Sequence, residues 1–228
     1  ACPSQVVEGQ SYISADFWHE VRKLIKERHP GDLFVFPMAG ASGDQSPHIQ
    51  FRRRAEERLW ERLGISQTEE IARRIVNAVE YVLPAAKRDI RQIVPFAHKV
   101  DDIRLPPRKI TAAEAELAKQ EYERLARTPA TDRSRHVLLN RSKEVIDRYA
   151  RQDREPQYEM KLHAIRLGDI AIATNPFELF LDYGIQIKAR SLAEQTFVVQ
   201  LSGGGTYLPT AKAVVGGHYS AGAADNRV

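Results

Sequence analysis

The stretch QYEMKLHAIRLGDIAIATNP, residues 157–176, carries the pattern that decides the fold. Its first half alternates apolar and polar side chains, as a half-buried strand does, and the apolar positions are Tyr158, Met160, Leu162 and Ala164. The Leu167-Gly168-Asp169 sequence then predicts a turn, and IAIAT predicts a second strand directly after it. The stretch therefore predicts two strands joined by a short turn.

Helical spacing of apolar residues predicts two helices on the amino-terminal side of these strands. One covers residues 14–31, with Ser14 as its N-cap. The other covers residues 66–87 and opens with a capping box formed by Ser66 and Glu69.

Further strands and a third helix complete the pattern. DLFVFPM, residues 32–38, predicts a buried strand, and TFVVQLSGGGTYLPT, residues 196–210, predicts a strand that runs into a glycine loop. Between the last two strands, residues 176–193 predict a helix with Pro176 in its first turn. The alternation predicts an α/β fold with mixed α+β layers, in which strands end in active-site loops.

Residues 104–157 differ in character from the rest of the chain, because they are highly charged. They predict two amphipathic helices joined around Thr128-Pro129, inserted into a single domain that spans residues 1–228. Such a helical insertion is most simply a solvated surface feature, and the sequence offers no chemistry within it.

Composition excludes several classes of protein. The chain has 34 basic and 30 acidic residues, and no basic block is interleaved with aromatic residues, so nucleic acid is not expected as a partner. One cysteine excludes a disulfide framework and a cysteine-based zinc site. No apolar run reaches the roughly 18 residues that would indicate a transmembrane segment.

The segment AGASGDQSP, residues 39–47, is the first candidate site. Gly40 and Gly43 permit unusual backbone angles, so spacing alone favours a well-made turn, and a loop whose amides crowd a ligand is the alternative. Its Ser46 lies outside a G-x-S-x-G nucleophile elbow, and no lysine follows the glycines as in a phosphate-binding loop.

Three later residues are candidates because each stands after a predicted strand or in a glycine loop. Glu178 begins the predicted helix after IAIAT, and a carboxylate there is also explained by the helix dipole. Tyr207 follows three glycines, while His218 and Tyr219 follow two. Taken singly, each is as well explained as an ordinary loop residue.

The order of these segments resembles that of the neutral (non-lysosomal) ceramidase family, loosely over residues 30–222. The family's GD-x-SP motif is matched by Gly43, Asp44, Ser46 and Pro47. Its zinc-binding glutamate in a PGE sequence is similar to Pro176-Phe177-Glu178, although Phe177 replaces the glycine. Its zinc-binding tyrosine in a Y-x-T-T segment is similar to the one in Tyr207-Leu208-Pro209-Thr210, and a later tyrosine that faces the substrate corresponds to Tyr219. AHKVDDI, residues 97–103, resembles a further tract of the family, here interpreted as structural.

The resemblance implies a zinc-dependent amide hydrolase that cleaves an N-acyl amide, such as a ceramide-like lipid, with water activated by the metal. Glu178 and Tyr207 would be metal ligands, together with two histidines expected upstream of this chain. Ser46 and Tyr219 would be catalytic, with Ser46 expected to orient the substrate because no histidine base stands next to it in sequence. Gly43, Asp44 and His218 would bind substrate.

The same resemblance implies a setting for the protein. The chain would be part of a larger ceramidase-like catalytic domain, inactive by itself, in a protein that is secreted, periplasmic or at the cell surface and able to contact a membrane surface. Two alternatives stay open. One is a non-catalytic binding or structural module of a larger secreted protein, and the other is a metal-independent serine hydrolase that uses Ser46.

Overall fold

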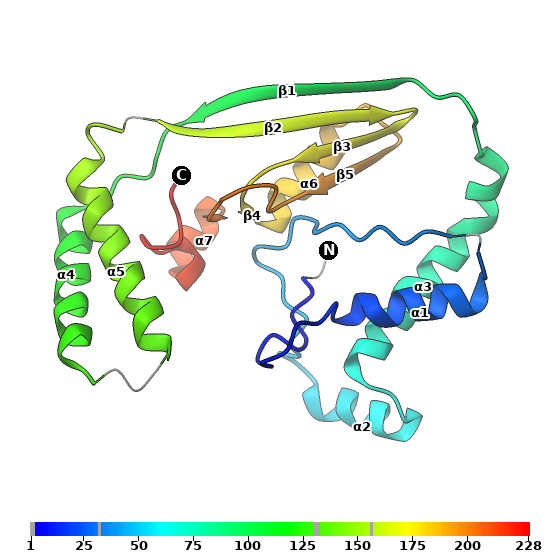
Figure 1. The fold of residues 1–228 in the computed structure, drawn as a ribbon, viewed down its shortest axis with the longest axis horizontal. Coiled ribbons are helices and arrows are strands. Elements are labelled where there is room, and N and C mark those ends of the chain that lie inside the picture. Colours follow the sequence, from blue (N-terminus) through cyan, green and yellow to red (C-terminus); the bar gives the residue numbers. More distant parts are fainter. Residues whose placement is uncertain (1–2, 32, 130–132, 156) are drawn as a thin grey trace. The chain divides into compact units, whose positions relative to one another are not determined.

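The computed structural model describes residues 3–31, 33–129, 133–155 and 157–228 (Figure 1). The chain divides into two compact units. The first unit comprises Ala1–Gly40 and Gln45–Pro95, and the second comprises Ala41–Asp44 and Phe96–Val228. The expectation of one domain over residues 1–228 stays a prediction.

The first unit is helical and contains α1 (Phe17–Arg28), α2 (Arg53–Leu63), α3 (Gln67–Ala86) and the short 3-10 helix η1 (Lys87–Asp89). Its core forms where α1 packs on α3. The buried core side chains are Phe17, Val21, Ile25, Ala72 and Val76. Burial of each of the larger ones contributes roughly 1.5–3 kcal/mol.

The helix caps confirm one sequence prediction and correct another. Ser66 and Glu69 form the predicted capping box at the start of α3. The N-cap of α1 is Asp16 and not Ser14, because the Asp16 Oδ1 atom accepts the Phe17 amide at 2.7 Å. Ser14 instead stabilises the turn that precedes the helix, since its Oγ atom accepts the Asp16 amide at 2.9 Å.

The predicted strand over residues 32–38 is wrong for residues 33–38, which are irregular, and residue 32 lies outside the described residues. Leu33 and Val35 pack against the helical core, whereas Phe34 and Phe36 are 90 % and 70 % exposed. Side-chain exposure therefore alternates along residues 33–36 as it would in a strand, but the described part of this unit contains no strand with which the segment could pair.

The second unit is built on a four-stranded mixed sheet with the order β1-β2-β3-β5. These strands are Phe96–Leu105, Tyr158–Leu167, Ile170–Thr174 and Gln195–Val199. β1, β2 and β3 are antiparallel neighbours, and β3 pairs with β5 in parallel. Figure 1 shows β1 and β2 running side by side as the longest strands. The sequence predicted β2, β3 and β5 but missed β1.

The rest of the second unit contains α4 (Ala112–Arg127), α5 (Arg133–Arg151), α6 (Leu181–Arg190), α7 (Ala211–Gly216) and the 3-10 helix η2 (Tyr219–Ala221). A two-stranded parallel pair joins β4 (Glu178–Leu179) to β6 (Tyr207–Leu208). Over the described residues, seven α-helices and a mixed sheet confirm the predicted mixed α/β fold class.

The predicted helix over residues 176–193 begins later than expected. Pro176 precedes β4, and α6 starts only at Leu181, after Phe180 as N-cap. The apolar residues before Leu181 are used elsewhere, because Leu179 packs in a small core with Ala41 and Val198. Glu178 is therefore on a short strand and not in a first helical turn.

Two helices form within residues 104–157, as predicted, and they pack against each other. They are more than a solvated surface, because Arg148 of α5 is buried. Its guanidinium donates to the carbonyl oxygens of Ala223 at 2.5 Å, Asn226 at 3.2 Å and Arg108 at 3.3 Å. The insertion therefore holds the C-terminal segment of the chain.

Candidate active site

Glu178 and Tyr207 are brought together by backbone pairing. They lie opposite each other in the parallel β4–β6 pair, and the Glu178 amide donates to the Thr206 carbonyl at 3.1 Å. On its other side, Tyr207 bridges to Asn226, and its amide donates to the Asp225 carbonyl at 2.9 Å. Tyr207 is thus held between the glutamate strand and the C-terminal segment.

Tyr219 completes a cluster with these two residues. Its hydroxyl lies 3.0 Å from the Tyr207 hydroxyl, and the two rings meet edge to face, with centroids 5.6 Å apart. Burial, followed by hydrogen bonds with Tyr219 and Glu178, raises the pKa of Tyr207. The Tyr207 side chain is therefore a neutral phenol at physiological pH and joins Glu178 to Tyr219.

His218 lies beside this cluster and contacts it through Tyr219. The His218 and Tyr219 ring centroids are 4.4 Å apart, and the His218 Nδ1 atom is 3.4 Å from the Ser220 hydroxyl. These contacts orient the Tyr219 ring.

Gly43 and Asp44 fix the segment that carries Glu178. The Gly43 amide donates to the Leu179 carbonyl at 2.9 Å, and a Cβ atom at Gly43 would lie 2.3 Å from the Glu178 carbonyl oxygen. Asp44 accepts the Leu181 amide at 2.8 Å, where α6 begins. This carboxylate satisfies an otherwise open amide at a helix N-terminus. Both residues therefore help to position Glu178, and their role in substrate binding, which the resemblance implies, stays a prediction.

Gln200 is a positioning residue that the sequence did not reveal. It is 5 % exposed, and its Oε1 atom accepts the Ser42 amide at 3.1 Å and the Leu179 amide at 2.9 Å. Its Nε2 atom donates to the Ser42 hydroxyl at 3.0 Å. A glutamine after a strand gives no signal of this role, because the two amides are far from it in sequence.

The glycine loop before Tyr207 passes close to the segment before Glu178. A Cβ atom at Gly205 would lie 1.8 Å from the Pro176 carbonyl oxygen, so only glycine fits there. Asn175 stabilises the same approach, because its Oδ1 atom accepts the Phe177 amide at 3.0 Å and its carbonyl accepts the Ser202 amide at 2.9 Å.

The C-terminal segment that carries Tyr219 is anchored by α5. Arg141 forms an ion pair with Asp225, and burial raises the pKa of that carboxyl even though Arg141 acts in the opposite direction. Together with the contacts of Arg148, this pair links the helical insertion to the tyrosine cluster.

Ser46 belongs to the first unit, where its hydroxyl lies 2.8 Å from the His48 Nδ1 atom. The same hydroxyl accepts the His48 amide at 3.1 Å. On the opposite side of the ring, the His48 Nε2 atom is 3.4 Å from a carboxylate oxygen of Glu8. The expectation that no histidine base stands next to Ser46 is therefore wrong, since a base two residues away contacts it.

The oxygen atoms of Glu178 and Tyr207 are suitable zinc donors but form only part of a ligand set. Structural and catalytic zinc sites use three or four protein ligands, most of them nitrogen or sulfur. Over the described residues, no three histidine, cysteine, aspartate or glutamate side chains are grouped closely enough to hold a metal ion. The chemistry of the donors thus fits zinc in part, with further ligands required.

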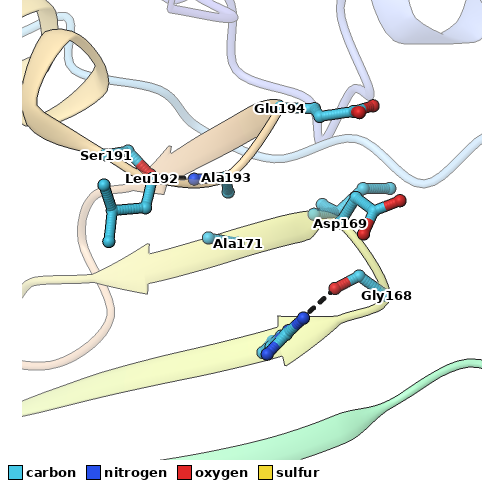
Figure 2. Close-up of a pocket in the computed structure, with 9 residues that line it drawn as sticks. Gly168, Asp169, Ala171, Ser191, Leu192, Ala193 and Glu194 are labelled. Carbon is cyan, nitrogen blue, oxygen red and sulfur yellow. Dashed lines mark hydrogen bonds between the residues drawn. The ribbon is translucent and has the colours of Figure 1, made fainter.

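A hollow of about 610 Å³ lies at the other end of the sheet (Figure 2). It is lined by Arg166, Gly168–Ala171 and Ser191–Glu194. Figure 2 shows Gly168 and Asp169 at the turn between β2 and β3, and Ser191–Glu194 on the loop before β5. The hollow is therefore at the amino ends of β3 and β5, whereas the Glu178–Tyr207–Tyr219 cluster follows their carboxyl ends, where ligands gather in layered α/β folds.

Comparisons of this chain with protein-family models, with curated proteins and with solved structures give no match. Among the described residues, none of the helices combines the length and apolar character needed to cross a membrane.

Proposed function

We propose that the protein is a zinc-dependent amide hydrolase that cleaves an N-acyl amide, either a ceramide-like lipid or another N-acyl amine. The observation that carries the proposal is the convergence of Glu178, Tyr207 and Tyr219, which are separated in sequence but joined through β4, β6 and the 3.0 Å contact between the two phenols. A carboxylate, a neutral phenol and a more exposed phenol offer metal-ligating and hydrogen-bonding groups in one place.

The residues have separate roles in this proposal. Zinc, when bound, acts as a Lewis acid and makes water a better nucleophile near neutral pH. Glu178 and Tyr207 would hold the ion together with ligands beyond this pair. Tyr219, which is 54 % exposed, can donate its hydroxyl hydrogen to the amide oxygen as negative charge develops there.

The surrounding residues keep this arrangement in place. Gly43, Asp44 and Gln200 fix the Glu178 strand, while His218 orients the Tyr219 ring. Ser46 is assigned to orientation of the substrate. Secretion, a periplasmic location or display at the cell surface, together with contact with a membrane surface, belongs to the same proposal.

The second candidate is a metal-independent serine hydrolase, and the contact between Ser46 and His48 favours it. His48 can take the Ser46 hydroxyl proton as the oxygen attacks the amide carbon and can then give it to the leaving amine. Glu8, 3.4 Å from the far ring nitrogen, can orient the imidazole. This arrangement forms within the first unit alone.

Hydrolysis of a long-chain N-acyl amine by the full-length protein tests the two candidates. The zinc hydrolase requires loss of amine release with a chelator, recovery with zinc, and loss in Glu178→Ala but not in the exposed control Glu159→Ala. The serine hydrolase instead requires chelator resistance, labelling of Ser46 by a serine-reactive probe, and loss of labelling in His48→Ala. No turnover by either route would contradict both and favour a binding module.

A further inference from the structure

Two imidazoles meet on the β1–β2 ladder, and neither has been given a catalytic, metal-binding or substrate-binding role above. The His98 Nε2 atom is 3.0 Å from the His163 Nδ1 atom. The ring planes differ by 14°, and the ring centroids are 5.2 Å apart, so the facing nitrogens are the closest part of the pair. One ring donates a hydrogen and the other accepts it, and both nitrogens point at the space between them.

The strand register explains why these side chains meet. His98 lies opposite Ile165 and His163 lies opposite Val100, so the histidines are diagonal neighbours on one face of an antiparallel pair. The ladder is continuous from Phe96 to Leu105, and the His163 amide also donates to the Thr174 hydroxyl at 3.1 Å. The spacing of the two imidazoles is therefore set by paired backbone and not by a loop.

The charges next to the pair do not oppose a cation. The next residues along this face are Asp102 and Lys161, whose side chains form an ion pair of 2.7 Å. The Lys161 charge is thus compensated by a carboxylate. His98 is exposed, so solvent has access to the pair.

We propose that His98 and His163 form a binding site for a divalent transition-metal ion of the kind that prefers imidazole, namely copper, nickel or zinc. The hydrogen between the two rings moves to the outer nitrogen of its own ring, which leaves a lone pair on each facing nitrogen. No proton is lost overall, and both rings bind as neutral imidazoles. Water completes the coordination, since the described residues hold no third ligand of this kind at the pair.

Calorimetric titration of the purified chain with Ni²⁺ tests the proposal. Cys2→Ser is included in every protein, because the one thiol could bind the metal by itself. His98→Ala and His163→Ala should each weaken Ni²⁺ binding by at least about tenfold, since each removes one of two protein ligands. His19→Ala, at an exposed histidine of α1, and Glu178→Ala should leave the affinity unchanged.

A spectroscopic readout separates loss of a ligand from loss of structure. Substoichiometric Ni²⁺ should broaden the backbone amide signals of Val100 and Ile165 in the parent protein and not in His98→Ala, while the remaining signals of the variant stay dispersed. Equal Ni²⁺ affinity in the parent and both histidine variants, or broadening centred elsewhere, would overturn the proposal. The Glu178→Ala arm keeps this result distinct from that of the proposed zinc hydrolase.

Discussion

The hydroxyl of Tyr219 lies 3.0 Å from that of Tyr207, although Tyr207 is on a strand and Tyr219 begins a 3-10 helix after a glycine turn. Tyr207 is the more buried of the two and is also hydrogen-bonded to Glu178, which contributes to its raised pKa. The hydrogen bonds therefore connect the carboxylate of Glu178, through the Tyr207 phenol, to the exposed phenol of Tyr219, which a substrate can reach.

Tyr219→Phe tests the role of that exposed phenol. The variant keeps the ring that packs on Tyr207 and His218 but loses the hydroxyl, so the fold should be unchanged. Loss of one donor to a developing oxyanion costs about 10²- to 10³-fold in kcat. Steady-state amine release measures the effect, with Tyr81→Phe on α3 as the exposed control. An unchanged kcat would remove Tyr219 from the reaction.

Gly43→Ala tests the close approach of Gly43 to the glutamate strand. A Cβ atom 2.3 Å from the Glu178 carbonyl oxygen forces the backbone to shift, so the free energy of unfolding should fall by about 1–3 kcal/mol. Gly204→Ala is the matched control, because nothing lies within 4 Å of a Cβ atom there. Urea unfolding of the two variants decides the point, and equal stability would argue against the observed contact.

Gln200→Leu tests the buried amide that links Ser42 to Leu179. The variant has a similar volume but cannot accept either amide, and each donor left unsatisfied costs about 1–3 kcal/mol. Gln186→Leu, at an exposed position of α6, should change stability little. Thermal unfolding compares the stability of the two variants. Amine release should fall only in Gln200→Leu, because the hydrogen bond between Gln200 and the Leu179 amide fixes the strand of Glu178.

Acid should weaken the first unit through Glu69. The Ser66 backbone amide, and then its hydroxyl, lower the pKa of the Glu69 carboxyl in the folded state. The resulting stability is present above the unfolded pKa of roughly 4.3 and is lost as pH falls through the lower folded value. Glu69→Gln should therefore show a smaller loss of stability between pH 6 and pH 3 than the parent, as measured by urea unfolding. The same loss in both proteins would contradict this assignment.

Local patterns predicted those parts of the fold that depend on neighbouring residues. The α3 capping box and the alternation from Tyr158 to Ala164 involve contacts within a few positions, so they could be read directly. The sequence does not predict β1, because most of its residues are exposed and its polar and charged positions follow no strand pattern. Pairing with β2 makes it a strand.

In the candidate site too, the sequence predicts what nearby residues determine and misses what distant residues determine. Glu178, Tyr207 and Tyr219 were named from their place after strands and glycines, and backbone pairing brings them together. Gln200 was not named because its partners, Ser42 and Leu179, are distant in sequence. His48 was visible two residues after Ser46, but only the structure showed that a turn directs its ring back to that hydroxyl.

Zinc content of the full-length protein tests the central claim most directly. His98→Ala is included in every protein, so that the His98–His163 pair holds no zinc. After dialysis against a weak chelator, elemental analysis should find stoichiometric zinc in this parent and in Glu159→Ala, and little in Glu178→Ala. Loss of even an indirect partner of a zinc ligand costs about 10- to 100-fold in affinity, so loss of a direct ligand should cost at least as much. Equal zinc in the parent and in Glu178→Ala, or none in either, would contradict the account.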